Sequence, residues 1–130
     1  MKKEKYTLQL GMIYHLKNEL EMILKNDLDG ISRLWFSLFN KLILEEHSAL
    51  ESLKENLILK YGSLTDEQNY FISEKLETGE INPNYNLFIT EFNNILTQLK
   101  EIEYYPLKPE YFTLITNKEI QFMYTFVKID

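Results

Sequence analysis

The chain has 130 residues, a net charge of −6 at neutral pH and no cysteine. Its length is that of a single domain, and a hydrophobic content of 45% is enough for a core and argues against intrinsic disorder. The lack of cysteine excludes thiol catalysis, disulfides and cysteine-ligated metal centres. No stretch reaches the ~18 apolar residues of a membrane-spanning helix, so we expect no membrane partner.

Glycines mark the ends of the first two expected helices. Gly30 follows a first helix at about residues 11–27, and Gly62 follows a second at about 31–61. A helix of ~31 residues would extend ~46 Å, which is long for a domain of this size. We therefore expect the second helix to bend or to project beyond a globular body.

Proline and a capping pattern mark two further helices. Pro83 and the asparagines beside it precede a third helix at about 85–101. Thr116 and Glu119 form a T-x-x-E capping box, which predicts a short last helix at about 117–127.

The two halves of the second helix have different apolar patterns. Residues 31–44 are apolar on nearly all faces, whereas residues 45–61 carry only a narrow stripe. The third helix carries a matching stripe, so we expect it to pair antiparallel with 45–61; a coiled coil with a second chain is the less favoured alternative. The two stripes are Ala49, Leu50, Leu53, Leu57, Ile58 and Tyr61, and Phe88, Phe92, Ile95, Leu99 and Ile102.

The connection at residues 62–84 has two competing interpretations. Thr65 and Gln68 form a capping pattern for a short helix at 66–76, whereas "YFIS" and "EIN" could form a β-hairpin around Thr78-Gly79, which we favour. The aromatic segment "IEYYPL" is more typical of a strand and could pair with "KYTLQL" near the N-terminus.

These elements predict the fold class. We expect a single domain over residues 1–130, mainly α with a minor β element. Its main feature is a long antiparallel helical hairpin or bundle. A small β-hairpin or strand pair is expected at 1–10, 68–82 and 101–107.

Two histidine–glutamate pairs are the only pattern that suggests a metal. His15 with Glu19 and His47 with Glu51 are each four residues apart, which places both side chains of a pair on one helical face. A dinuclear carboxylate bundle needs additional glutamates, and Leu44 occupies the position where one would be required. We therefore expect no metal and no other cofactor.

Other chemistries have little support. The serines lie in no G-x-S-x-G motif, the glycines form no phosphate loop, and the acids lie on solvated helix faces, so we expect no enzyme. The C-terminal aromatics could stack single-stranded bases, but their helical spacing favours a core. They are Tyr104, Tyr105, Tyr111, Phe112, Phe122, Tyr124 and Phe126.

The negative charge is concentrated in one stretch. Residues 45–80 contain nine acids and three lysines, a net charge of −6, and the remainder of the chain sums to zero. Such a surface repels nucleic acid and favours a basic protein partner, although a face kept only for solubility is the alternative. The candidate partner-binding residues are Glu46, Glu51, Glu55, Glu67, Glu74 and Glu77.

The chain also resembles a loose family of short uncharacterised proteins of tailed phages and prophages. The resemblance extends over nearly the whole chain, from an R-x-x-F-like entry through an "EE…E…LxxKYG" pattern to the segment "EIEYYPL". It depends on Arg33, Glu46, Glu51, Leu57, Lys60, Tyr61, Gly62, Phe88, Glu91, Leu96, Glu101, Glu103 and Leu107. It implies a phage origin and provides no catalytic motif.

Together these observations predict a non-enzymatic, phage-encoded protein that binds another protein. We expect a virion or assembly component that binds a larger partner, with an early inhibitor of a host defence factor as the alternative. A second alternative is an unrecognised enzyme or metal-binding helical protein. The expected location is the cytoplasm of an infected bacterium or the virion, and a homo-oligomer stays open.

Overall fold

The computed structural model describes residues 2–64, 70–116 and 120–127. It confirms the predicted fold class, since the described chain is mainly helical with small antiparallel strand pairs. The chain divides into two compact units: unit 1 comprises residues 1–47 and 99–130, and unit 2 comprises residues 48–98. The long helix α2 (Gly30–Tyr61) contributes residues to both.

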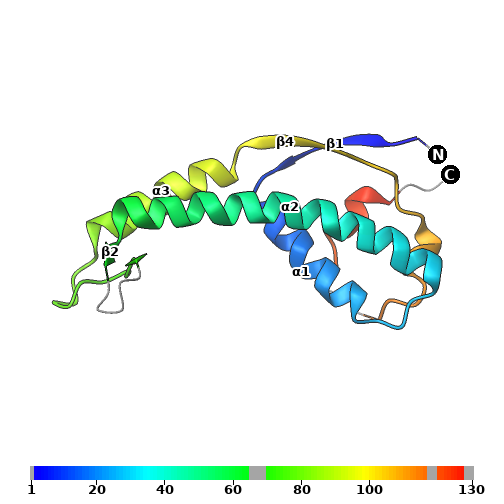
Figure 1. Ribbon diagram of the computed structural model, residues 1–130, viewed down its shortest axis with the longest axis horizontal. Coiled ribbons are helices and arrows are strands. Elements are labelled where there is room, and N and C mark those ends of the chain that lie inside the picture. The colour runs from blue at the N-terminus through cyan, green and yellow to red at the C-terminus, as the bar shows by residue number, and fades with distance from the viewer. Residues whose placement is uncertain (1, 65–69, 117–119, 128–130) are drawn as a thin grey trace. The chain divides into compact units, whose positions relative to one another are not determined.

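In unit 1, a strand near the N-terminus pairs with a strand that follows unit 2 in sequence. The strands β1 (Glu4–Gln9) and β4 (Leu99–Tyr104) are antiparallel, with Glu4 opposite Tyr104 and Gln9 opposite Leu99 (Figure 1). This confirms the predicted pairing of "KYTLQL" with the start of "IEYYPL", but the strand lies at Leu99–Tyr104 rather than at 101–107. The Tyr104 hydroxyl donates a hydrogen bond to the carbonyl oxygen of Trp35 at 2.7 Å, which ties the strand pair to α2.

Two helices provide seven of the sixteen buried apolar side chains in the described part of unit 1. The helix α1 (Met12–Leu24) and the first part of α2 bury apolar side chains at three- and four-residue spacing. Residues 31–44, which the sequence shows to be apolar on nearly all faces, are not covered on all of them, because Ile31, Leu34, Leu38 and Leu44 are 41–63% exposed. The fully buried side chains are Ile13, Leu16, Leu20 and Ile23 on α1, and Phe36, Phe39 and Ile43 on α2.

The turn between α1 and α2 is fixed by side-chain hydrogen bonds to both helix ends. The Asp29 carboxylate accepts from the Ser32 amide and hydroxyl, each at 2.9 Å, and so caps the start of α2. The Arg33 guanidinium donates to the carbonyl oxygens of Leu24 (3.2 Å) and Asn26 (2.7 Å) at the end of α1. The single arginine of the chain therefore serves as a helix cap.

The last part of unit 1 differs from the predicted helix at 117–127. Thr116 is described, but Glu119, its capping-box partner, lies outside the described residues. Residues 120–127 form only a four-residue 3₁₀ helix, η2 (Met123–Phe126), after an earlier one, η1 (Pro109–Phe112). The Glu19 carboxylate accepts from the amides of Phe122 (3.2 Å) and Met123 (2.9 Å). The predicted helix is therefore wrong for the described residues 120–127, which are held by a hydrogen-bond contact with α1.

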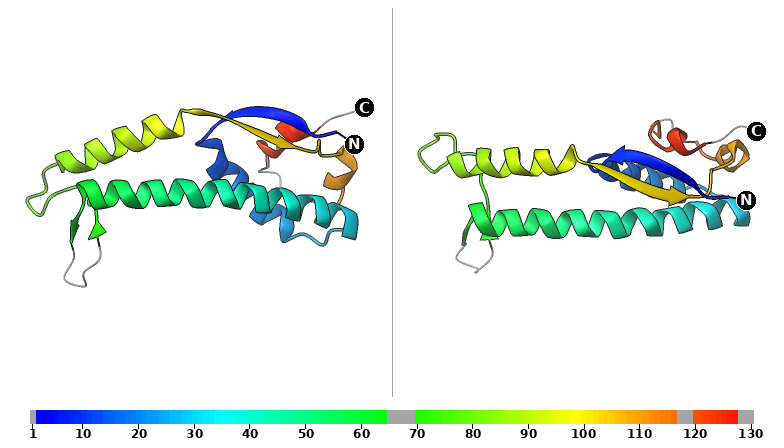
Figure 2. Two further views of the ribbon diagram at one scale, coloured as in Figure 1. Left: turned by 45° about the horizontal axis from the view of Figure 1, so that its top comes forward. Right: turned by 90° about the horizontal axis from the view of Figure 1, so that it is seen from above.

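Unit 2 is built on an antiparallel helix pair. Helix α3 (Pro83–Leu96) runs back along the part of α2 that belongs to unit 2 (Figure 2). The Glu91 carboxylate accepts a hydrogen bond from the Tyr61 hydroxyl at 2.5 Å and lies 3.4 Å from the Lys60 ammonium. The pairing of the third helix with residues 45–61 is therefore confirmed.

Details of both predicted stripes need correction. Leu53 is 44% exposed, so it is not part of the seam, and Ala49 is exposed as well. Helix α3 ends at Leu96 rather than at residue 101, and Leu99 and Ile102 belong to β4 in unit 1. The early end has a physical cause, since the alternating pattern of Leu99–Tyr104 is satisfied by pairing with β1.

The connection between α2 and α3 contains a second strand pair. Strand β2 (Ser63–Leu64) pairs antiparallel with β3 (Tyr70–Phe71), and a single bridge joins Lys75 to Ile81. Gly79, with a φ of 88°, forms the turn between these two bridging residues.

The predicted turn at Thr78-Gly79 is therefore present. Its expected first arm is not, because Tyr70 and Phe71 pair with β2 instead. The alternative helix at 66–76 is wrong for its described residues 70–76, which form β3 and irregular chain; the capping residues Thr65 and Gln68 lie outside the described part.

Candidate functional site

The six sequence-predicted partner-binding glutamates are divided between the two units. Glu46 belongs to unit 1, whereas Glu51, Glu55, Glu74 and Glu77 belong to unit 2. Glu67 lies outside the described residues. Within unit 2, Glu55, Glu74 and Glu77 are exposed and Glu51 is half-buried.

Glu46 has a structural role. Its carboxylate lies 2.9 Å from the Lys100 ammonium on β4, and its side chain is only 20% exposed. At 100° per residue, Glu46 and Glu51 are separated by about 140° around α2, so they do not share a helical face. We therefore remove Glu46 from the candidate surface.

Most of the net charge belongs to unit 2. Residues 48–98 contain eight acids and three lysines, a net charge of −5, whereas the residues of unit 1 contain twelve acids and eleven bases, a net charge of −1. The sequence-based assignment of charge to residues 45–80 thus corresponds closely to a structural unit.

Exposed apolar side chains accompany these acids at residues 70–82. Tyr70 is 48% exposed, and Ile81 is 62% exposed. Glu74, Glu77 and Glu80 are interspersed along the same segment and are exposed. Sequence reasoning assigned this region to a hairpin and missed its exposed apolar groups, because alternating patterns do not show which face is covered.

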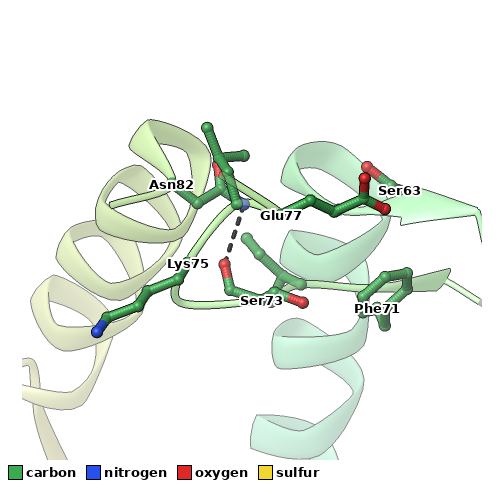
Figure 3. A pocket seen from close by; sticks show the side chains of 9 residues that line it. Ser63, Phe71, Ser73, Lys75, Glu77 and Asn82 are labelled. Atoms are coloured by element: carbon green, nitrogen blue, oxygen red, sulfur yellow. Dashed lines mark hydrogen bonds between the residues drawn. The ribbon is translucent and has the colours of Figure 1, made fainter. Parts of the chain in front are cut away.

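A cleft lies among these residues. Its volume is about 320 Å³, and Figure 3 shows side chains from β2, β3 and the chain before α3 around it. We call it the 62–82 cleft. Its principal lining residues are Ser63, Phe71, Ile72, Leu76, Glu77 and Asn82.

The cleft is held by the backbone around Gly62 and by Asn82. The Gly62 amide donates to the Ile58 carbonyl at 2.7 Å, and a side chain at this position would place its Cβ 2.5 Å from the carbonyl oxygens of both Ile58 and Phe71. The Asn82 side chain donates to the Ser73 carbonyl at 3.0 Å, which is the dashed line in Figure 3, and accepts from the Asn84 amide at the start of α3.

Gly62 therefore has two functions, of which the sequence indicated only one. It follows the end of α2, as its position predicts. It also allows β3 to approach the end of α2 closely, and this second function depends on a tertiary contact that no local pattern records.

The two histidines have aromatic neighbours. The His15 ring stacks on Phe122 with centroids 4.5 Å apart, and the His47 ring meets Tyr14 edge to face at 5.1 Å. Within residues 2–64, 70–116 and 120–127, no three His, Asp or Glu side chains are grouped in a way that could hold a metal ion.

Glu19 is the one buried carboxyl group among the described residues, at 4% exposure. Burial raises its pKa above the ordinary value of 4.5, and the amides of Met123 and Phe122 and the nearby His15 oppose part of that rise. Because Glu19 accepts hydrogen bonds from the η2 segment, the burial of its carboxyl group is explained by the fold of unit 1.

None of the helices in the described part of the chain has the length and apolar composition needed to cross a membrane. Comparisons with protein-family models, with curated proteins and with solved structures gave no match. The candidate site therefore depends on the residues of this chain alone.

Proposed function

We propose that this protein acts by binding another protein. The proposed binding surface is the acidic surface of unit 2, on which large apolar side chains are also exposed. The observation that carries the proposal is the coincidence of two properties in one unit. Unit 2 holds −5 of the net charge, and its 70–82 segment exposes large apolar side chains between exposed glutamates.

Each property supports binding in a different way. A surface of one sign accelerates the encounter with a partner of the opposite sign, and this effect weakens as salt increases. Exposed apolar groups rimmed by charge are typical of interaction sites. Solubility alone would explain the exposed acids but not the exposed apolar side chains of Tyr70 and Ile81.

The resemblance to phage proteins provides a setting for this proposal. In that setting the partner is a component of the virion or of its assembly, and the chain has no catalytic role. A host defence factor is the alternative partner, and the two are distinguished by whether the protein is recovered with purified particles or with a host protein.

The test is a charge reversal confined to unit 2. Glu55→Lys with Glu74→Lys changes two exposed side chains that do not line the 62–82 cleft. Tagged protein would be expressed during infection, and proteins recovered with it and with purified particles would be quantified by mass spectrometry at two salt concentrations. We expect the variant to lose the partners that wild type retains at low salt.

A matched control places the same change of charge in unit 1. Asp27→Lys with Glu45→Lys also reverses two exposed acids. We expect this control to recover partners as wild type does. Equal recovery by both double variants, with the fold intact by circular dichroism, would exclude the acidic surface of unit 2 from partner binding.

A further inference from the structure

We propose that the 62–82 cleft is the specific docking point on this surface, and that it accepts one apolar side chain from a basic segment of the partner. This inference rests on the proposed function, because it assumes that unit 2 binds a protein. It adds the chemistry of the partner and the place where that chemistry is recognised.

The size and lining of the cleft fit one or two side chains. Its volume of about 320 Å³ is at the lower end of the ~300–1,000 Å³ typical of ligand pockets. Phe71 and Leu76 supply apolar walls while remaining 46% and 43% exposed. Because these walls are open to solvent, an incoming apolar group would cover surface that the fold leaves uncovered.

The charges around the cleft favour a cation beside the apolar group. Glu77 lines the cleft, and Glu74 and Glu80 flank it along the chain. In Figure 3 the Glu77 carboxylate lies on the side of Ser63, whereas the Lys75 side chain points away toward α3. The cleft is thus lined by one carboxylate and by one lysine, Lys75, whose side chains extend in opposite directions in Figure 3. Because Glu74 and Glu80 add to Glu77, acids outnumber bases along this segment, so lysine or arginine flanking the partner's apolar residue would be complementary.

Charge also argues against the other occupants. A second copy of the chain would bring another unit with a net charge of −5, and nucleic acid would bring phosphates, so both are repelled. A free small molecule would gain little burial between walls that are nearly half exposed. A protein segment does not depend on the cleft alone, because its flanking residues also contact the surrounding acidic surface.

The experiment is a selection of peptides from a random displayed library on the full-length protein, followed by affinity measurements with synthetic copies of the enriched peptides. We expect the enriched peptides to combine lysine or arginine with at least one large apolar residue. Replacing that apolar residue by alanine is expected to weaken binding about tenfold, as removal of several methylene groups from a pocket does.

Matched variants of the protein test the location. Leu76→Ala removes a wall of the cleft, and Leu87→Ala removes a similarly exposed leucine on α3, 52% exposed, which does not line the cleft. We expect Leu76→Ala to weaken the peptide about fivefold or more and Leu87→Ala to bind as wild type. Leu76→Trp, which fills the cleft without deleting packing, keeps the test valid if the alanine variant is unfolded.

The outcomes separate the two proposals. If basic peptides are enriched but bind all three variants as they bind wild type, the cleft is overturned and the acidic surface of the proposed function stands. If basic peptides are not enriched, the charge argument that supports both proposals is overturned. Enriched peptides whose binding requires both the apolar residue and Leu76 establish the cleft as the docking point.

Discussion

The two units of the molecule differ in the size of their buried core and in their net charge: unit 1 has the larger core and unit 2 has the larger charge. Among the described residues, unit 1 buries sixteen apolar side chains and unit 2 buries four, namely Leu50, Leu57, Phe88 and Phe92. Unit 1 has a net charge of −1 and unit 2 of −5. Unit 2, which has fewer buried apolar side chains, therefore also has the greater repulsion between its own charges.

The difference indicates where stability and recognition reside. Local opening is easiest where few apolar contacts are buried, and binding surfaces are commonly found in such regions. Unit 1 has the features of a scaffold, with aromatic packing, capped helices and a tertiary cap on its last segment. Unit 2 has the features of a binding element, because its helix pair supports a segment with exposed acidic and apolar side chains.

The largest expected effect comes from the unit 1 core. Phe39 is fully buried and lies within 4.9 Å, centroid to centroid, of both Tyr104 and Phe126. Phe39→Ala is expected to lower the free energy of unfolding by about 3–5 kcal/mol and to expose amides throughout unit 1. Urea denaturation and residue-resolved hydrogen exchange measure the two effects.

Phe92→Ala is the matched change in unit 2, where Phe92 is 7% exposed. We expect faster hydrogen exchange within residues 48–64 and 70–98, with amides of α1 and β1 protected as in wild type. If Phe92→Ala instead accelerates exchange equally in both units, the chain unfolds as one cooperative body and the comparison between the units fails.

A smaller effect is expected from the close approach at Gly62. Its φ is not positive, so alanine suits the backbone, but the added Cβ would lie 2.5 Å from two backbone carbonyl oxygens that cannot move independently. Gly62→Ala is expected to destabilise unit 2 by about 1–3 kcal/mol, as overpacking does, and to displace β3 from β2. Loss of the β2–β3 cross-strand NOEs would report the displacement.

Gly30→Ala is the control, because a Cβ at Gly30 meets no atom within 4 Å and Gly30 is the first residue of α2. Alanine there is expected to leave stability unchanged or slightly higher. A Gly62→Ala variant as stable as the Gly30→Ala variant, with β2–β3 intact, would show that the end of α2 can adjust and that this contact does not shape the cleft.

The sequence predicted the parts of the fold that depend on local signals. Gly62 follows the end of α2 and Pro83 begins α3, as expected, and the β1–β4 pairing follows from alternating segments. Gly30, which was expected to follow the first helix, instead begins α2, because α1 ends at Leu24. The confirmed features depend on residue types with strong conformational preferences, such as glycine and proline, so they can be predicted from a single sequence.

The features that the sequence missed depend on contacts between distant residues. In place of the expected last helix, the described residues 120–127 form η2, where Glu19, about a hundred positions earlier, accepts hydrogen bonds from the amides of Phe122 and Met123. Glu46 was assigned to the partner surface, but its carboxylate lies 2.9 Å from the Lys100 ammonium on β4. The 62–82 cleft needs Gly62, Phe71 and Asn82 together, and no spacing rule joins them. The distribution of charge along the sequence was enough to point to the region of unit 2, whereas the cleft could be found only in the structure.

The smallest expected effect is a difference in pH dependence between the units. In unit 2, the hydrogen bond from Tyr61, assisted by Lys60, holds the pKa of Glu91 below its usual 4.5. Its stabilisation is present above pH 4.5 and is lost as pH falls through the lowered pKa. In unit 1, burial raises the pKa of Glu19, so its contribution is complete below pH 4.5 and is lost as pH rises through the raised pKa.

Acidification should therefore affect the units in opposite senses. From pH 7 toward 4.5 we expect the urea midpoint of unit 1 amides, followed by NMR, to rise relative to that of a Glu19→Gln variant. Below pH 4.5 we expect the midpoint of unit 2 amides to fall in wild type and to change less in Glu91→Gln, which cannot be protonated. Parallel pH profiles of wild type and Glu91→Gln in unit 2 would show that the Tyr61–Glu91 contact does not hold α3 on α2. The four buried side chains would then be the main attachment between these helices.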